Sequence, residues 1–189
     1  MNKAGDENRS VRFTKQRIRM AVLELMRKKP YLSITVGELA ERANISRSTF
    51  YTHYHDVPEL VEQIEQQLID QISALMDTIT VEGYVEGEHP IMTQIFSVMT
   101  ENGAVFRVLL SENGDIRFLN RLIGILVDAA AAKWGANARS PENFSIAMPF
   151  FVGGMINAFL KNYNAPQPVS PERLGYVVGE YLAFTREIV

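Results

Sequence analysis

Between residues 46 and 53 the chain carries a dense set of hydrogen-bonding side chains. These are the hydroxyl, guanidinium, phenol and imidazole groups of Ser46, Arg47, Ser48, Thr49, Tyr51, Thr52 and His53. Such groups are suited to contacts with phosphate oxygens and with the edges of bases. A solvated helix face of ordinary composition is the alternative reading, so the elements that hold these side chains must decide between the two.

A short helix is predicted directly before this set. Its apolar face is formed by Val36, Leu39, Ala40 and Ala43, which recur at helical spacing. Thr35 and Glu38 have the spacing of a capping box, which begins a helix. Asn44 follows where a turn needs a residue that tolerates the left-handed conformation.

A second short helix is predicted to begin after Ser46, which can cap it. In that helix Phe50 and Tyr54 would pack inward, with Ile45 as an apolar plug between the two helices. Two helices joined by a tight turn form a helix-turn-helix, whose second helix lies in the DNA major groove. The polar set would then face the groove.

The stretch Ile45-Ser-Arg-Ser-Thr-Phe-Tyr-Thr-His-Tyr54, followed by Asp56 and Glu59-Leu60, resembles the TetR family of bacterial transcriptional regulators. The resemblance extends over roughly residues 14–68. It implies an all-α fold of about nine helices. An N-terminal three-helix DNA-binding domain would be joined by a long helix to a C-terminal effector and dimerisation domain.

The resemblance also implies roles for individual residues. Tyr51 and His53 would bind phosphates, and Arg47 through Thr49 would approach bases or backbone. The full set expected to bind DNA is Thr35, Val36, Ser46, Arg47, Ser48, Thr49, Tyr51, Thr52 and His53. A lysine is usual in the family where this chain has Val57, and a glycine where it has Asn44. The missing phosphate contact could be supplied by Arg9, Arg12, Lys15 and Arg17.

Charge is divided unevenly along the 189 residues. The first 60 residues hold 4 Lys and 7 Arg against 7 acidic residues, a net charge of +4, and the remainder has a net charge of −7. Only the first part suits a polyanionic partner. The absence of cysteine excludes disulfides and fits a cytoplasmic protein. No secretory signal is recognised, and the apolar run Ile146–Leu160 predicts a buried helix rather than a membrane span.

Three segments are expected along the chain. Residues 1–13 would be a disordered basic arm, residues 14–56 the DNA-binding domain with its motif at 35–54, and residues 57–189 the ligand-binding and dimerisation domain. Helix starts are predicted at Thr14, Asp56, Pro90, Ser140-Pro141 and Ser170-Pro171. Residues 81–89 would be a loop, and the long helix from residue 57 to about residue 79 would connect the two domains.

The C-terminal domain is expected to bind an effector and to dimerise. An aromatic and methionine-rich lining for an apolar effector is predicted from Met92, Phe96, Met99, Phe106, Phe118, Leu122, Trp134 and Phe151, although each of these also suits a plain core. Clustered glycines on the last two helices predict a homodimer interface, as do Ile146, Phe150, Ile156 and Tyr163, which an intrachain core leaves without an obvious partner. Its expected residues are Phe150, Gly153, Gly154, Asn157, Val178, Tyr181 and Leu182.

No enzymatic motif, cofactor site or metal site is predicted. His53 and His55 point to different faces of a helix and lack a third ligand at suitable spacing. The resulting expectation is a homodimeric repressor that reads a pseudo-palindromic operator and is released by a small apolar effector. The alternatives are a TetR-like co-activator with little DNA affinity, for which Val57 is the support, and an enzyme that uses the apolar cavity.

Overall fold

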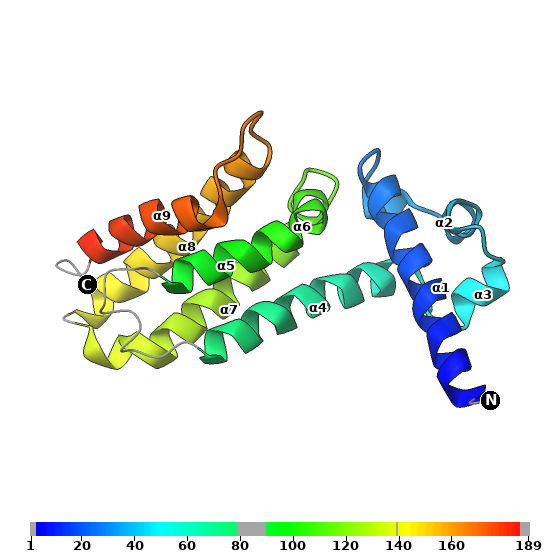
Figure 1. Ribbon diagram of the computed structural model, residues 1–189, viewed down its shortest axis with the longest axis horizontal. Coiled ribbons are helices and arrows are strands. Elements are labelled where there is room, and N and C mark those ends of the chain that lie inside the picture. Colours follow the sequence, from blue (N-terminus) through cyan, green and yellow to red (C-terminus); the bar gives the residue numbers. More distant parts are fainter. Residues whose placement is uncertain (1–2, 79–89, 139, 186–189) are drawn as a thin grey trace. The chain divides into compact units, whose positions relative to one another are not determined.

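The computed structural model describes residues 3–78, 90–138 and 140–185, and these residues form helices and turns without a strand (Figure 1). The α-helices are α1 (Lys3–Met26), α2 (Val36–Ala43), α3 (Arg47–Tyr51), α4 (Val57–Thr78), α5 (Pro90–Glu101), α6 (Gly103–Leu109), α7 (Ile116–Trp134), α8 (Pro141–Tyr163) and α9 (Pro171–Thr185). The all-α prediction is therefore confirmed. The expected loop at residues 81–89 lies outside the described residues.

The chain divides into two compact units. Unit 1 contains residues 1–67 together with residues 108–116, and unit 2 contains residues 68–107 and 117–189. Helix α4 thus begins in unit 1 and continues into unit 2. The chain also returns to unit 1 after α6, a division that no sequence pattern had indicated.

The start of the first helix corrects the sequence prediction. A disordered arm over residues 1–13 and a helix cap at Thr14 were expected, but α1 already begins at Lys3. Thr14 lies inside the helix and donates its hydroxyl hydrogen to the Ser10 carbonyl over 3.0 Å. The arm has a physical reason to be helical, since Ala4, Glu7 and Arg9 are good helix formers and the segment holds no proline.

The core of unit 1 is built where α1, α2 and α3 meet (Figure 1). Its buried side chains include Ile18, Val22, Met26, Leu39, Ala43, Phe50 and Leu60. Phe50 is fully buried and packs near the ring of Tyr54, 5.7 Å between centroids. The inward orientation predicted for these two aromatic residues is therefore confirmed, and it leaves the other side of α3 free.

Local capping signals fix where the longer helices begin. Asp56 Oδ1 accepts from the Glu59 amide over 2.8 Å, and Glu59 Oε2 accepts from the His55 amide over 2.6 Å at the start of α4. Ser140 caps α8 with Pro141 at its first position, and Ser170 Oγ accepts from the Arg173 amide at the start of α9. All three predicted starts are confirmed.

Unit 2 is organised around the packing of α5 against α9, with α8 beside both (Figure 1). A β-carbon added to Gly175 on α9 would lie 2.6 Å from the Thr93 amide nitrogen on α5, so the glycine permits this close approach. Phe106 forms an aromatic cluster, with ring centroids 6.5 Å from Phe118 and 6.0 Å from Phe159.

Helices α8 and α9 keep apolar side chains in solvent. Phe150 is 85% exposed, Ile146 68% and Tyr181 70%, whereas Gly153 and Gly154 have no neighbour within 4 Å of an added β-carbon. The sequence had suggested that Ile156 and Tyr163 also lack partners, and this is wrong. Ile156 is buried in the core, and the Tyr163 ring packs on Gly103.

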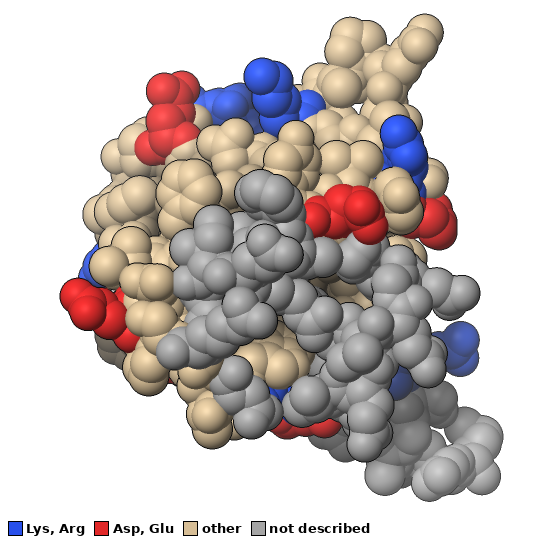
Figure 2. Space-filling model, turned by 90° about the vertical axis from the view of Figure 1, so that its left-hand side faces the viewer, with Lys and Arg blue, Asp and Glu red and all other residues tan. Residues whose placement is uncertain are grey.

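Figure 2 views the molecule from the end at which unit 2 is drawn in Figure 1. The described surface there is mostly uncharged, with Lys, Arg, Asp and Glu scattered toward its margin. Among the described helices, α8 is long and apolar enough to cross a membrane by length and composition, a test that core helices of soluble proteins also pass. About a third of that apolar window is buried within the fold.

Candidate nucleic-acid interface

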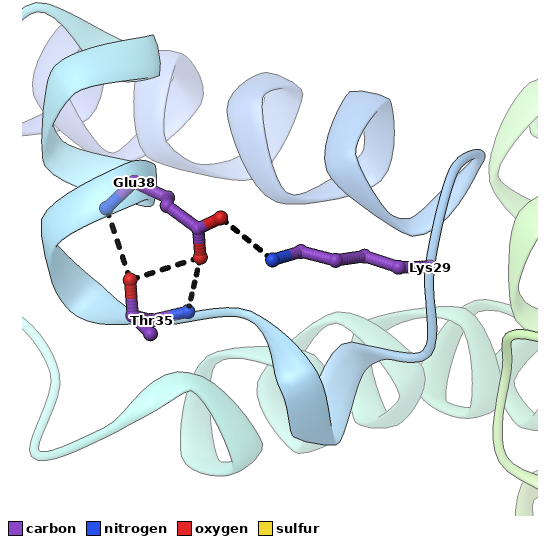
Figure 3. Close-up of polar contacts among 3 residues, drawn as sticks. All are labelled: Lys29, Thr35 and Glu38. Carbon is purple, nitrogen blue, oxygen red and sulfur yellow. Dashed lines mark hydrogen bonds and ion pairs between the residues drawn. The ribbon is translucent and has the colours of Figure 1, made fainter.

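The first element of the interface is the start of α2, which a complete capping box holds in place (Figure 3). The Thr35 hydroxyl accepts from the Glu38 amide over 3.2 Å, and Glu38 Oε2 accepts from the Thr35 amide over 2.9 Å. Lys29 Nζ donates to the other carboxylate oxygen over 2.6 Å. The Lys29 ammonium and the two Thr35 donors lower the pKa of Glu38 to about 2, so the box is intact at neutral pH.

The turn between α2 and α3 takes the conformation predicted for it. Asn44 has φ 50° and ψ 53°, and among the described residues it is the one non-glycine residue with positive φ. Arg17 of α1 donates to the Asn44 carbonyl over 2.5 Å, and the Ile45 amide donates to the Ala40 carbonyl over 2.9 Å. Helix α1 therefore anchors the turn directly, which fixes the angle at which the chain enters α3.

Helix α3 begins at a serine cap and carries a network of hydroxyls. Ser46 Oγ accepts from the Thr49 amide over 3.0 Å and lies 2.7 Å from Ser48 Oγ and 2.8 Å from Thr49 Oγ1. Thr52 Oγ1 donates to the Thr49 carbonyl over 2.7 Å. These bonds connect the hydroxyls to one another and to the backbone, so that the helix presents a continuous polar surface.

The face of α3 opposite its core residue is accessible. Tyr51 is 59% exposed, and Arg47, Ser48 and Thr52 are also exposed, whereas His53 and Thr49 are half-buried. The Tyr51 ring meets the edge of the buried Phe50 ring, 5.6 Å between centroids at 81°. Such edge-to-face contact limits the motion of the Tyr51 ring, which favours a defined position for its hydroxyl.

One basic side chain of α1, that of Lys15, lies beside Tyr54 after the end of α3. Lys15 Nζ lies 5.8 Å from the centroid of the Tyr54 ring, and burial raises the pKa of the Tyr54 hydroxyl. Arg9, Arg12 and Lys15 are exposed, whereas Arg17 is occupied with the turn. Arg17 is one of the four residues expected to supply the phosphate contact of the family lysine. Because its guanidinium binds the Asn44 carbonyl, it stabilises the turn before α3 instead.

Position 57, where the family usually has lysine, is part of the core in this chain. Val57 is only 3% exposed, which explains why an apolar residue is accommodated there. Beside it, the pKa of Asp56 is lowered because its carboxylate accepts from the Glu59 amide and from His55. No group of three metal-binding side chains occurs in residues 3–78, 90–138 and 140–185.

All nine residues expected to bind DNA belong to unit 1, on α2, on α3 or directly beside them. Sequence reasoning missed Gly37, at which an added β-carbon would lie 2.7 Å from the Arg47 guanidinium. A glycine in the first turn of a short amphipathic helix was the signal that could have drawn attention to it.

Comparison with known proteins agrees with this geometry. The profile for bacterial regulatory proteins of the tetR family matches residues 18–64, which include the whole helix-turn-helix. An HTH-type transcriptional regulator of Mycobacterium tuberculosis, described as uncharacterised, is 25% identical over 97% of this chain and 87% of its own length.

Solved structures share the fold over nearly the whole chain. A TetR transcriptional regulator from Streptococcus agalactiae superposes with a TM-score of 0.66 at 21% identity, covering 95% of this chain and 99% of that one. The fatty acid degradation regulator FadR from Bacillus halodurans superposes with a TM-score of 0.62 at 13% identity, covering 89% and 94%.

The helix-turn-helix with its capped helices and exposed polar face defines a DNA-binding transcriptional regulator. Residues 18–64 of this chain carry the helix-turn-helix of the TetR family, and the curated relatives that resemble the chain are described as HTH-type transcriptional regulators.

The residues expected to line an effector site lie in unit 2. Six of them are buried, namely Met92, Phe96, Met99, Phe106, Phe118 and Leu122, and two are half-buried, namely Trp134 and Phe151.

The residues expected at the dimer interface differ in exposure. Four are exposed (Phe150, Gly154, Asn157 and Tyr181), two are half-buried (Gly153 and Val178), and Leu182 is buried. The exposed members share α8 and α9, the helices on which the sequence placed the interface.

Proposed function

We propose that the protein is a homodimeric repressor that binds a pseudo-palindromic operator through α3 and is released by a small apolar effector. The observation that carries the proposal is the polar face of α3, with Arg47, Ser48, Tyr51 and Thr52 exposed beside the capped start of α2. Repression is the usual role in the TetR family. In a dimer the two copies of α3 would read two half-sites.

The apolar nature of the effector follows from the charge of the core. Among the described residues the buried charged side chain is Glu65, which belongs to unit 1. The described core of unit 2 therefore offers no buried charge to compensate a charged ligand, and desolvation of such a ligand would be costly. The similarity in fold to a regulator of fatty acid degradation is compatible with an apolar ligand.

The same observation argues against catalysis. An acid–base mechanism needs titratable groups that converge on a site, and the described core of unit 2 holds no buried carboxylate or amine. We therefore propose that the protein has no enzymatic activity. As a regulator of transcription it would act in the cytoplasm, without a membrane partner.

Operator binding is the first experiment. Selection from random duplexes should yield a symmetric site, and Tyr51→Ala and His53→Ala should each weaken its binding by about 1–3 kcal/mol, the range for a lost contact at such an interface. Val169→Ala is a control, because Val169 is exposed and belongs to unit 2, outside the unit that carries α2 and α3. Circular dichroism should show intact folding for all three variants. Unchanged affinity for both α3 variants would contradict the proposal.

A co-activator with little DNA affinity is the competing function. Its support is Val57, which replaces a family lysine and is buried. A DNA-binding regulator should bind any duplex at low salt, with an affinity that falls steeply as salt is raised. A protein that binds no duplex at 50 mM salt would favour the co-activator.

A further inference from the structure

Gly37 and Arg47 form a contact that the sequence pattern did not predict. A β-carbon built on Gly37 would lie 2.7 Å from Arg47 Nη2, 3.2 Å from its Cζ and 3.3 Å from its Nε. These distances are shorter than ordinary van der Waals contact. The guanidinium group therefore occupies the space in which any side chain at position 37 would begin.

The backbone itself does not require glycine at this position. Gly37 lies in the first turn of α2, and its φ is not in the left-handed region. Glycine is among the least favourable residues within a helix. The space that it leaves for Arg47 is the structural feature that explains its presence.

The Arg47 guanidinium keeps its hydrogen-bond donors available. Arg47 is exposed and forms no ion pair with the described residues. The nearest acid along α2, Glu38, is already bound to Lys29 and Thr35. A guanidinium carries five donors in a planar fork that matches phosphate geometry. Nothing in the described part of the protein competes with such a partner.

We infer that Gly37 is a positioning residue for DNA binding, which holds the Arg47 guanidinium against the first turn of α2 so that Arg47 binds the phosphate backbone and not a base edge. This inference rests on the proposed operator binding. A guanidinium that extends from the start of α3 back toward α2 points along the surface between the two helices. It would therefore meet the strand that passes Thr35 and Val36, the residues expected at the backbone.

The test uses the substitution Gly37→Ala in the full-length protein. The displaced group is the end of a flexible side chain, so folding should tolerate the new methyl group, and the gain in helix propensity should raise Tm by roughly 1–3 °C. Binding to the selected operator should nevertheless weaken by about 3- to 30-fold. The loss should be similar for operator and unrelated duplexes, because phosphate contacts carry no sequence information.

Three further variants, namely Arg47→Ala, the double variant and Gly124→Ala, separate the mechanism from its alternatives. In an Arg47→Ala background, Gly37→Ala should have no additional effect, and both single variants should reduce the salt slope by about one phosphate contact. Gly124→Ala is the matched control: its β-carbon would meet no atom within 4 Å, so it should change Tm without changing affinity.

The outcomes are distinct. If wild-type protein binds no duplex, the proposed function fails and the inference fails with it. If wild-type protein binds while Gly37→Ala binds equally well, the inference alone is overturned. A loss that persists in the Arg47→Ala background would show a direct clash of the methyl group with DNA. A loss confined to the operator would show that Arg47 reads a base. Either of these results would also overturn the inference.

Discussion

The hydroxyl of Tyr31 donates a hydrogen bond to Asp115 Oδ2 over 3.0 Å, which joins the turn after α1 to the segment that follows α6. The Tyr31 amide also donates to the Asn113 carbonyl over 3.4 Å. Tyr31 is 5% exposed. These bonds give a physical reason why residues 108–116 belong to the DNA-binding unit although they lie far along the chain.

Removal of the Tyr31 hydroxyl should destabilise unit 1. Tyr31→Phe keeps the ring but leaves a half-buried carboxylate without one donor, so the free energy of unfolding should fall by about 1–2 kcal/mol. Urea denaturation measures this change. Asp115→Asn retains an acceptor oxygen and should cost less, and the double variant should show non-additive coupling. Strict additivity of the two single effects would show that the pair does not interact.

Acid should weaken the capping box of α2. Because the folded state lowers the pKa of Glu38 from 4.5 to about 2, the carboxylate stabilises the fold fully above about pH 4.5. That contribution is lost as the pH falls toward 2. The stability difference between wild type and Glu38→Gln should therefore shrink between pH 5 and pH 2. The contribution is small because the side chain is 44% exposed.

Denaturation at fixed pH values measures this effect, and Glu41→Gln is a control for the loss of one acid on the same helix. Glu41 is exposed and takes no part in the capping box. A stability difference for Glu38→Gln that stays constant from pH 5 to pH 2 would contradict the assignment.

Features set by neighbours in sequence were predictable, whereas those set by distant contacts were not. The Thr35–Glu38 box, the left-handed Asn44 and the Ser46 cap each depend on residues within about four positions, so sequence spacing alone identified them. The role of Gly175 could not be predicted in this way, because it depends on the close approach of Thr93 on another helix. Periodicity shows that a helix face is apolar but does not show which partner covers it.

The same distinction explains the errors. The start of α1 was misplaced because a polar segment without a cap looks like a disordered arm, although its residues favour helix. Tyr163 was left without a partner because its contact, Gly103, is 60 residues away and carries no side chain. At the candidate site, the residues of α3 were predictable from their motif. The Gly37–Arg47 contact was not, since it depends on how two helices cross.

The exposed apolar side chains of α8 and α9 should mediate dimerisation. A stable interface of standard size buries about 1,600 Å², and the 85% exposed Phe150 would lie within it. Phe150→Glu should convert a dimer to a monomer at micromolar concentration, as measured by sedimentation. Ile116→Glu, which changes an exposed apolar residue on α7, should leave the dimer intact. A wild-type monomer at tens of micromolar would refute the model.

Effector binding should be visible through Trp134, the one tryptophan of the chain. The side chain is half-buried in unit 2, the unit that holds the predicted apolar lining. An uncharged aromatic or aliphatic compound that enters this core should change Trp134 fluorescence and raise Tm. Arg107 and Arg117 are exposed and would not compensate a charged ligand in the interior.

The same compound should weaken operator binding, and thermodynamic linkage fixes by how much. If the compound lowers operator affinity by a given factor, a saturating operator must lower the affinity for the compound by the same factor. Fluorescence titrations with and without operator measure one side of this relation, and anisotropy titrations with and without compound measure the other. A screen in which apolar compounds change neither Tm nor operator affinity, while an anionic metabolite changes both, would show that the interior of unit 2 is not an apolar effector site. If a compound binds but the two factors are unequal, the compound also changes operator affinity in some way other than by binding to this protein.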